Sequence, residues 1–151
     1  GSQSMRMETI VEEIMAEPNP VGVSKIEVIQ NEIAEIIALW QKNNPVPGWF
    51  ASLKGAWFKA VGFLLKVVDY LILAVEDKIP DGPDKKATVL AAIGQIYDKI
   101  VPPLLPLFIK PFNYQIKSFV VDVLASLVID FIVSKYREGS WRPKTTLANL
   151  I

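Results

Sequence analysis

The segment that decides the fold covers residues 24–40 and reads SKIEVIQNEIAEIIALW. Its isoleucines recur at steps of three and four residues, with glutamates between them. This is the period of an amphipathic α-helix, whose apolar stripe faces a core or a partner. Ser24 and Glu27 have the spacing of a capping box, in which each side chain accepts a hydrogen bond from the other residue's backbone N–H. We therefore expect this helix to start at Ser24 and to end before the Asn43–Gly48 stretch, NNPVPG.

Three further segments show the same helical period. They cover residues 49–78, residues 82–100 after the turn Pro80-Asp81-Gly82-Pro83-Asp84, and residues 112–136. Prolines at 102, 103, 106 and 111 interrupt the chain between the last two, because proline lacks a backbone N–H and crowds the preceding turn. The sequence predicts an all-α fold: a compact bundle of four to five main helices with proline-rich breaks and no sheet.

The length of 151 residues suits one domain, since a domain of this size buries roughly 70% of the surface that its unfolded chain exposes. Residues 1–4, Gly-Ser-Gln-Ser, are typical of a tag remnant before Met5. We predict a single helical bundle domain over residues 5–139. Residues 140–151 form a C-terminal tail, whose Trp141, Leu147, Leu150 and Ile151 can dock on the bundle or on a neighbouring molecule.

Composition excludes several classes of function. The 16 acidic and 16 basic residues cancel, so the chain lacks the basic bias of a nucleic-acid-binding protein. His and Cys are absent, which removes the commonest general base and the most readily activated nucleophile. Asp122 and Asp130 lie two helical turns apart, roughly 12 Å, and belong to a polar strip with Ser118, Ser126 and Ser134 that we expect to face solvent or a subunit. We therefore predict no enzyme activity, no cofactor, no metal site and no nucleic-acid partner.

Three amphipathic helices with wide apolar sides exceed what one small core needs, which indicates a protein interface. On the last helix we expect one apolar side formed by Phe112, Ile116, Phe119/Val120, Val123/Leu124, Leu127/Val128 and Phe131/Ile132. The candidate interface residues are Ile26, Ile29, Ile33, Ile36 and Trp40 on the first helix, and Phe119, Val123, Leu127 and Phe131 on the last. We expect the partner to be a protein, in the first instance a second copy of this chain.

A second candidate site lies in residues 49–66, where aromatic residues alternate with lysines and no acidic residue occurs. The candidate membrane-surface residues are Trp49, Phe50, Lys54, Trp57, Phe58, Lys59 and Lys66. Such a pattern suits an interfacial helix on an anionic membrane. The alternative, which we favour, is that the aromatic residues belong to the core and the lysines to a solvated face. Gly55 and Gly62 lie on the same polar arc, where we expect another backbone to approach closely.

No segment is expected to span a bilayer, because charges interrupt every long apolar run. Residues 79–90, IPDGPDKKATVL, follow a strongly apolar helix and resemble segments of small phage-encoded holin-type proteins. This resemblance covers about a dozen residues and implies a lysis-associated protein at a membrane. A turn followed by lysines and an apolar run is also how any helix begins, so no activity is transferred from it.

The sequence therefore predicts a non-catalytic helical interaction or assembly protein that self-associates through apolar helix faces. Two alternatives stay open: a membrane-surface protein and a carrier of an apolar ligand inside the bundle. We expect a cytoplasmic location, peripheral to a membrane in the first alternative, and the lack of Cys suits a reducing compartment.

Overall fold

The computed structural model describes residues 22–44, 55–137, 139 and 147–150, and these form helices only, with no strand among them. The main elements are α2 (Gln30–Asn43), α4 (Ala56–Glu76), α5 (Gly82–Ile100) and a continuous helical run made of α6 (Asn113–Ser118), the π-helical segment η4 (Phe119–Ala125) and α7 (Ser126–Arg137). Short 3-10 helices are η1 (Ile26–Ile29), η2 (Pro102–Leu104), η3 (Lys110–Phe112) and η5 (Leu147–Leu150). The predicted all-α bundle is confirmed, with four main helices packed together.

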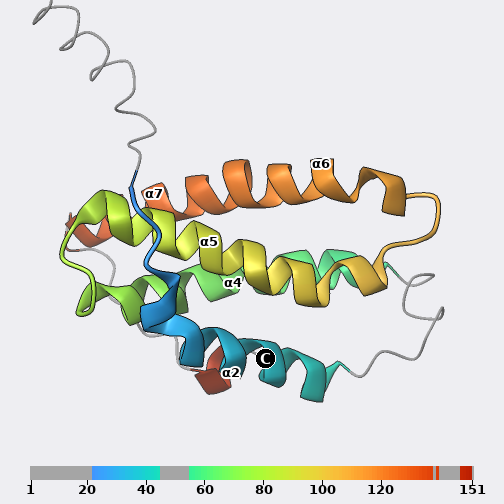
Figure 1. Ribbon diagram of the computed structural model, residues 1–151, viewed down its shortest axis with the longest axis horizontal. Coiled ribbons are helices and arrows are strands. Elements are labelled where there is room, and N and C mark those ends of the chain that lie inside the picture. Colours follow the sequence, from blue (N-terminus) through green and yellow to red (C-terminus); the bar gives the residue numbers. More distant parts are fainter. Residues whose placement is uncertain (1–21, 45–54, 138, 140–146, 151) are drawn as a thin grey trace, which may run out of the picture.

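Successive helices run in opposite directions, and α5 occupies the centre of the bundle (Figure 1). It packs against α4 and α2, and against η4 and α7 on its other side. In the view of Figure 1, α2 lies below the α4–α5 pair and the run from α6 to α7 lies above it. Both helices of the outer layers therefore have one face turned away from the rest of the chain.

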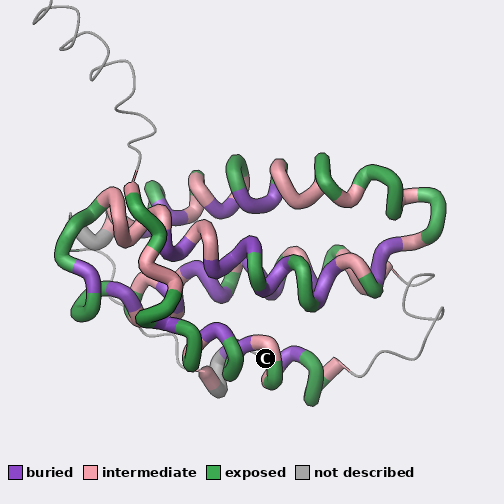
Figure 2. The backbone as a smooth tube through the Cα atoms, in the orientation of Figure 1, coloured by how far each residue is buried: buried purple, intermediate pink, exposed green. Residues whose placement is uncertain are grey.

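The core lies between the inner faces of the helices, where buried positions recur once per turn (Figure 2). The indole of Trp40 packs on the ring of Phe63 with 4.8 Å between ring centroids, which joins the end of α2 to α4. Leu150 of η5 is buried as well, and η5 contacts α4. Part of the C-terminal tail thus packs on its own bundle.

The start of the first helix differs from the prediction. A 3-10 turn, η1, precedes α2, and no side chain caps either element, so the capping box of Ser24 and Glu27 is wrong. Instead, Asp84 of α5 accepts a hydrogen bond from the Val23 N–H at 2.7 Å, and Thr88 accepts one from the Lys25 N–H at 2.8 Å. Side chains of a distant helix thus satisfy backbone donors of the segment that leads into η1.

Gly22 allows this attachment. A Cβ atom at this position would overlap the backbone carbonyl of Pro83 and lie 2.7 Å from the backbone nitrogen of Asp84. Only a residue without a side chain lets the incoming segment approach the start of α5 so closely. Close approach to a glycine therefore occurs here and not at Gly62, where an added Cβ would meet no atom within 4 Å. Gly55 has a different role, since its positive φ of 66° precedes the first residue of α4.

Candidate functional site

The run from α6 to α7 has two apolar faces. One face is buried against α4 and α5 and contains Val120, Val121, Ala125, Ile129 and Ile132. The other is exposed. Phe119, Val123, Leu127 and Phe131, called the outer stripe below, have exposed fractions between 43% and 62%.

The outer stripe follows from a sequence that is apolar over more than half of the helix circumference. We predicted one apolar side containing pairs such as Phe119/Val120 and Phe131/Ile132. The structure splits these pairs, because Val120 and Ile132 enter the core while Phe119 and Phe131 do not. The prediction of a single apolar face is therefore wrong. Its outer half is exposed, and Nζ of Lys135 lies over the Phe131 ring, 5.7 Å from its centroid.

The π-helical segment η4 lies in the middle of this run. Its i→i+5 hydrogen bonds make a wider turn than those of an α-helix. A spacing of four residues advances slightly more than one turn in an α-helix and slightly less than one in the wider segment. The two offsets have opposite signs and partly cancel along η4 and α7. The members of the outer stripe, which are spaced by four residues, therefore lie closer to one straight line than they would on a uniform α-helix.

The polar strip beside the outer stripe faces solvent and α5. Asp122, Asp130 and Ser134 are exposed, whereas Ser118 and Ser126 are half-buried. The carboxylate of Asp130 lies 3.0 Å from Nζ of Lys86 on α5. No base lies beside these groups in the interactions that the structure describes, and Asp130 helps to fix the last helix against α5.

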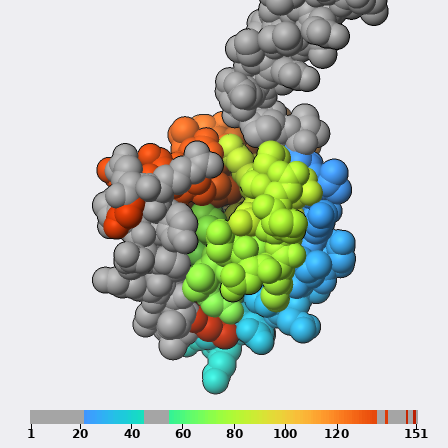
Figure 3. All heavy atoms as spheres, turned by 90° about the vertical axis from the view of Figure 1, so that its left-hand side faces the viewer, coloured from blue at the N-terminus to red at the C-terminus, as the bar shows by residue number. Residues whose placement is uncertain are grey.

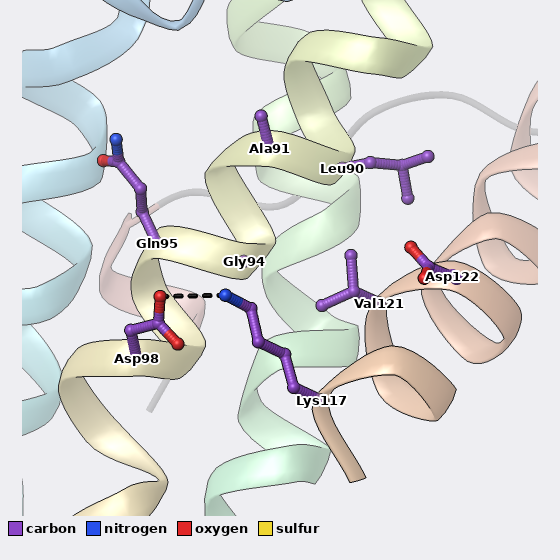
Figure 4. A pocket seen from close by; sticks show the side chains of 8 residues that line it. All are labelled: Leu90, Ala91, Gly94, Gln95, Asp98, Lys117, Val121 and Asp122. Atoms are coloured by element: carbon purple, nitrogen blue, oxygen red, sulfur yellow. Dashed lines mark hydrogen bonds and ion pairs between the residues drawn. The ribbon is translucent and has the colours of Figure 1, made fainter. Parts of the chain in front are cut away.

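An open groove of about 330 Å³ runs between α5 and η4 (Figure 4). Lys117 reaches across Gly94 to Asp98, with 2.9 Å between Nζ and Oδ2, and a Cβ on Gly94 would lie 3.6 Å from Cε of this lysine. Val121 and Asp122, on the same helical run as Lys117, form the wall that faces α5. Because the groove is open to solvent and its ion pair is already formed, it differs from the enclosed apolar cavity that a ligand carrier needs.

A buried tyrosine connects α5 to the first residue of α6. The ring of Tyr97 is fully buried, and its hydroxyl donates a hydrogen bond to Oδ1 of Asn113 at 2.8 Å. Burial, together with the negative charge of Asp98, raises the pKa of the Tyr97 hydroxyl to about 12. This group is therefore a neutral hydrogen-bond donor at physiological pH and serves as an anchor.

An ion pair joins α2 to the end of α4. Nζ of Lys78 lies 2.6 Å from Oε1 of Glu32. Burial disfavours ionisation of Glu32, but the hydrogen bond and positive charge of Lys78 outweigh it and hold the pKa of this carboxyl below its ordinary value. The pair contributes to the fit between the two helices.

The candidate interface residues of the first helix occupy the core. Ile29, Ile33, Ile36 and Trp40 are all at least 97% buried within the chain itself, and Ile26 is half-buried against the same core. The four buried side chains have no surface left for a partner. Of the candidate interface, the structure exposes the four residues of the outer stripe and leaves Ile26 partly accessible.

The candidate membrane-surface residues are distributed differently. Trp49, Phe50 and Lys54 lie outside the described residues. Trp57 is half-buried and stacks on Phe58, with 3.9 Å between ring centroids. Phe58 is 66% exposed, and the other two members of the set, Lys59 and Lys66, are exposed as well.

A third exposed apolar surface lies between the end of α5 and the first turn of α6. Leu107, Phe108, Phe112 and Tyr114 have exposed fractions of 57% to 83%. Of these, only Phe112 was named in the sequence analysis, as part of the apolar side of the last helix. Pro106 precedes this set and Pro111 interrupts it. Prolines within an apolar run were the sequence feature that could have predicted this exposed surface. A run broken by prolines cannot form one amphipathic helix, so its side chains need not all reach the core.

Among the described residues, no group of acidic side chains is arranged to hold a metal ion. No helix that the structure describes is long and apolar enough to cross a membrane. Comparison of the chain with protein-family models, with curated proteins and with solved structures found no match.

Proposed function

We propose that this protein is a non-catalytic assembly protein that self-associates through the outer stripe. The observation behind the proposal is the exposure of Phe119, Val123, Leu127 and Phe131 on a well-packed helix. If a large apolar side chain has about 200 Å² of surface, these fractions leave about 400 Å² of apolar surface exposed. The largest apolar patch on a typical monomer has about this area, about 300 to 600 Å², and such a patch is often functional.

A second copy of the same chain is the partner that this area fits. Two facing stripes offer about 800 Å² together, and flanking side chains raise the buried area toward the roughly 1,200 Å² of the smaller specific interfaces. The resulting association is of modest affinity and depends on protein concentration. The four residues of the stripe are uncharged. Lys135 lies beside one end of the stripe, with Nζ 5.7 Å from the Phe131 ring centroid, and its long side chain can keep the charge in solvent when two copies meet.

The stripe is also self-complementary. Its members are arranged symmetrically about Ala125, as required for an isologous contact between two antiparallel copies. A two-fold axis near this position brings Phe119 against Phe131 of the partner subunit and Val123 against the partner's Leu127. Side chains four residues apart form the ridge used in the commonest class of helix packing, with a crossing angle of about −50°.

The test is the molar mass in detergent-free buffer, measured by light scattering during size-exclusion chromatography over a range of concentrations. We expect a dimer that becomes a 16.8 kDa monomer in L127E, because the substitution places a carboxylate at the centre of the interface. The matched control is F58E, since Phe58 is exposed to a similar degree on a different helix. A wild-type monomer at all concentrations, or a dimer that survives L127E, would refute the proposal.

The absence of cysteine allows the orientation to be tested directly. In a mixture of V123C and L127C chains, the antiparallel contact predicts disulfide formation mainly between the two different variants. A parallel contact would instead favour disulfides between identical chains, and would overturn the two-fold arrangement while leaving self-association intact.

A further inference from the structure

The third exposed apolar surface lies at one end of the bundle. The last turns of α2 and α5 and the first turns of α4 and α6 meet at this end, on the right in Figure 1. The 3-10 helix η2, directly after α5, contacts α4, which places Phe58 at the same end as the connection from α5 to α6. We call the exposed residues Phe58, Leu107, Phe108, Phe112 and Tyr114 the aromatic end.

Charge is segregated along the bundle, and the aromatic end is the basic one. The described stretches nearest to it are residues 38–44, 55–65 and 98–117. They contain five lysines, at positions 42, 59, 99, 110 and 117, and one acidic residue, Asp98. Lys117 pairs with Asp98, while Lys42, Lys59, Lys99 and Lys110 are exposed and take part in none of the five ion pairs that the structure describes.

The opposite end contrasts with it. That end faces the viewer in Figure 3, where the turn from α4 to α5 lies beside residues 22–29. Its lysines are matched by acids: Lys85 lies 3.2 Å from Glu76, and Lys25 lies 3.4 Å from Asp84. Of the exposed lysines that form no ion pair among the described residues, four lie at the aromatic end, together with large apolar side chains, and Lys66 lies further along α4.

We propose that the aromatic end docks on the surface of an anionic phospholipid bilayer. Exposed aromatic and leucine side chains enter the boundary between headgroups and acyl chains, and lysines around them attract anionic headgroups. A surface that binds another protein contains fewer lysines than this one, since lysine is depleted in protein interfaces. The combination of protruding apolar side chains and exposed lysines is the one that suits an anionic bilayer.

Prolines restrict the backbone of the aromatic end. Pro106 and Pro111 lie on either side of the exposed Leu107 and Phe108, and fewer backbone conformations lower the entropy lost on docking. This site shares Phe58 and Lys59 with the one indicated by the sequence but leaves out Lys66, which lies ten residues into α4, away from this end. It is also independent of the outer stripe, which lies along η4 and α7.

The test is co-sedimentation of the full chain with vesicles of phosphatidylcholine containing 30% phosphatidylserine, compared with pure phosphatidylcholine. We expect binding to the anionic vesicles that weakens as salt is added. The variant K59E/K110E should bind at least about 25-fold more weakly, since each lysine near an anionic surface contributes about a fivefold effect. The variant L107S/F108S should lose at least about tenfold. Both pairs are exposed, and unchanged circular dichroism would verify that each variant folds.

The matched control is K66E, which makes the same charge change further along the same helix as Lys59 and should bind nearly as well as the wild type. The proposal is overturned if the wild type ignores anionic vesicles, if both end variants bind normally, or if K66E alone abolishes binding. Repeating the assay with monomeric L127E separates this site from self-association. Loss of the dimer with retained vesicle binding would leave this inference standing, and the converse result would leave the assembly proposal standing.

Discussion

Removing one oxygen atom from Tyr97 tests how α5 holds the last helix. Y97F keeps the buried ring but deletes the hydroxyl that donates to Oδ1 of Asn113 at 2.8 Å. A hydrogen bond of this kind contributes about 1 kcal/mol to the free energy of unfolding. Asn113 is only half-buried, so water can partly replace the lost donor, and we expect a loss of about 1 kcal/mol at pH 8.

The same variant predicts a change in the pH dependence of stability. The pKa of Tyr97 is raised to about 12 in the folded protein, whereas an unfolded tyrosine ionises near 10. The folded state therefore keeps a proton that the unfolded state releases, and the free energy of unfolding falls as pH rises from 10 to 12. The slope approaches 1.4 kcal/mol per pH unit at most. Y97F lacks this contribution, so its disadvantage should shrink with pH and vanish near pH 11.

The measurement is urea unfolding of both proteins at pH 8 and at pH 10.5 to 11, followed by tryptophan fluorescence. Trp40 is a suitable probe, because it is buried against Phe63 in the core. Other groups that titrate at high pH, such as Tyr70, are present in both proteins and cancel in the comparison. Parallel stability curves for the two proteins over this pH range would contradict the assigned role of the Tyr97 hydroxyl.

Two further predictions concern glycine and an ion pair. G22A should lower the free energy of unfolding by about 1 to 3 kcal/mol, because its methyl group overlaps the carbonyl of Pro83. G62A should raise it by about 0.5 to 1 kcal/mol, because its methyl group meets open space on α4. Thermal unfolding of the two variants checks this, and equal effects would contradict it. E32Q should cost about 0.5 to 1 kcal/mol at neutral pH, since it removes the charge that Lys78 contacts. The pKa of Glu32 is lowered in the folded state, so this stabilisation is present above about pH 4.5 and is lost as pH falls. Urea unfolding should therefore give the wild type and E32Q more similar free energies of unfolding at pH 3.5 than at pH 7. A difference that stays constant between the two pH values would argue against this role of Glu32.

Several local features were beyond prediction from the sequence, and each has a physical cause. Ser24 and Glu27 have the spacing of a capping box, yet Asp84 and Thr88 bind the nearby backbone donors instead. These acceptors lie about sixty residues away in the chain, and spacing along a sequence contains no information about such neighbours. The π-helical segment η4 was missed for a similar reason, because nothing in its apolar sequence distinguishes a wide turn from an ordinary one.

The candidate interface shows the same limit. The first helix and the last helix both have strong apolar stripes in the sequence, and both were expected to meet a partner. The structure buries Ile33 and Trp40 and exposes Leu127 and Phe131. Which stripe enters the core depends on the layer that each helix occupies. Periodicity alone predicts burial equally for both stripes.

The periodicity of apolar residues was sufficient to establish the all-α fold class of this protein. Apolar residues at steps of three and four, together with the prolines from 102 to 111, specify helices and the places where they end, because these are local properties of the backbone. The absence of His and Cys likewise narrows the available chemistry without any knowledge of the fold. Tertiary packing decided the rest. Only the stacking of four helices determines that the outer stripe is left uncovered and that aromatic residues and lysines from separate segments gather at one end, because burial is a property of the assembled layers.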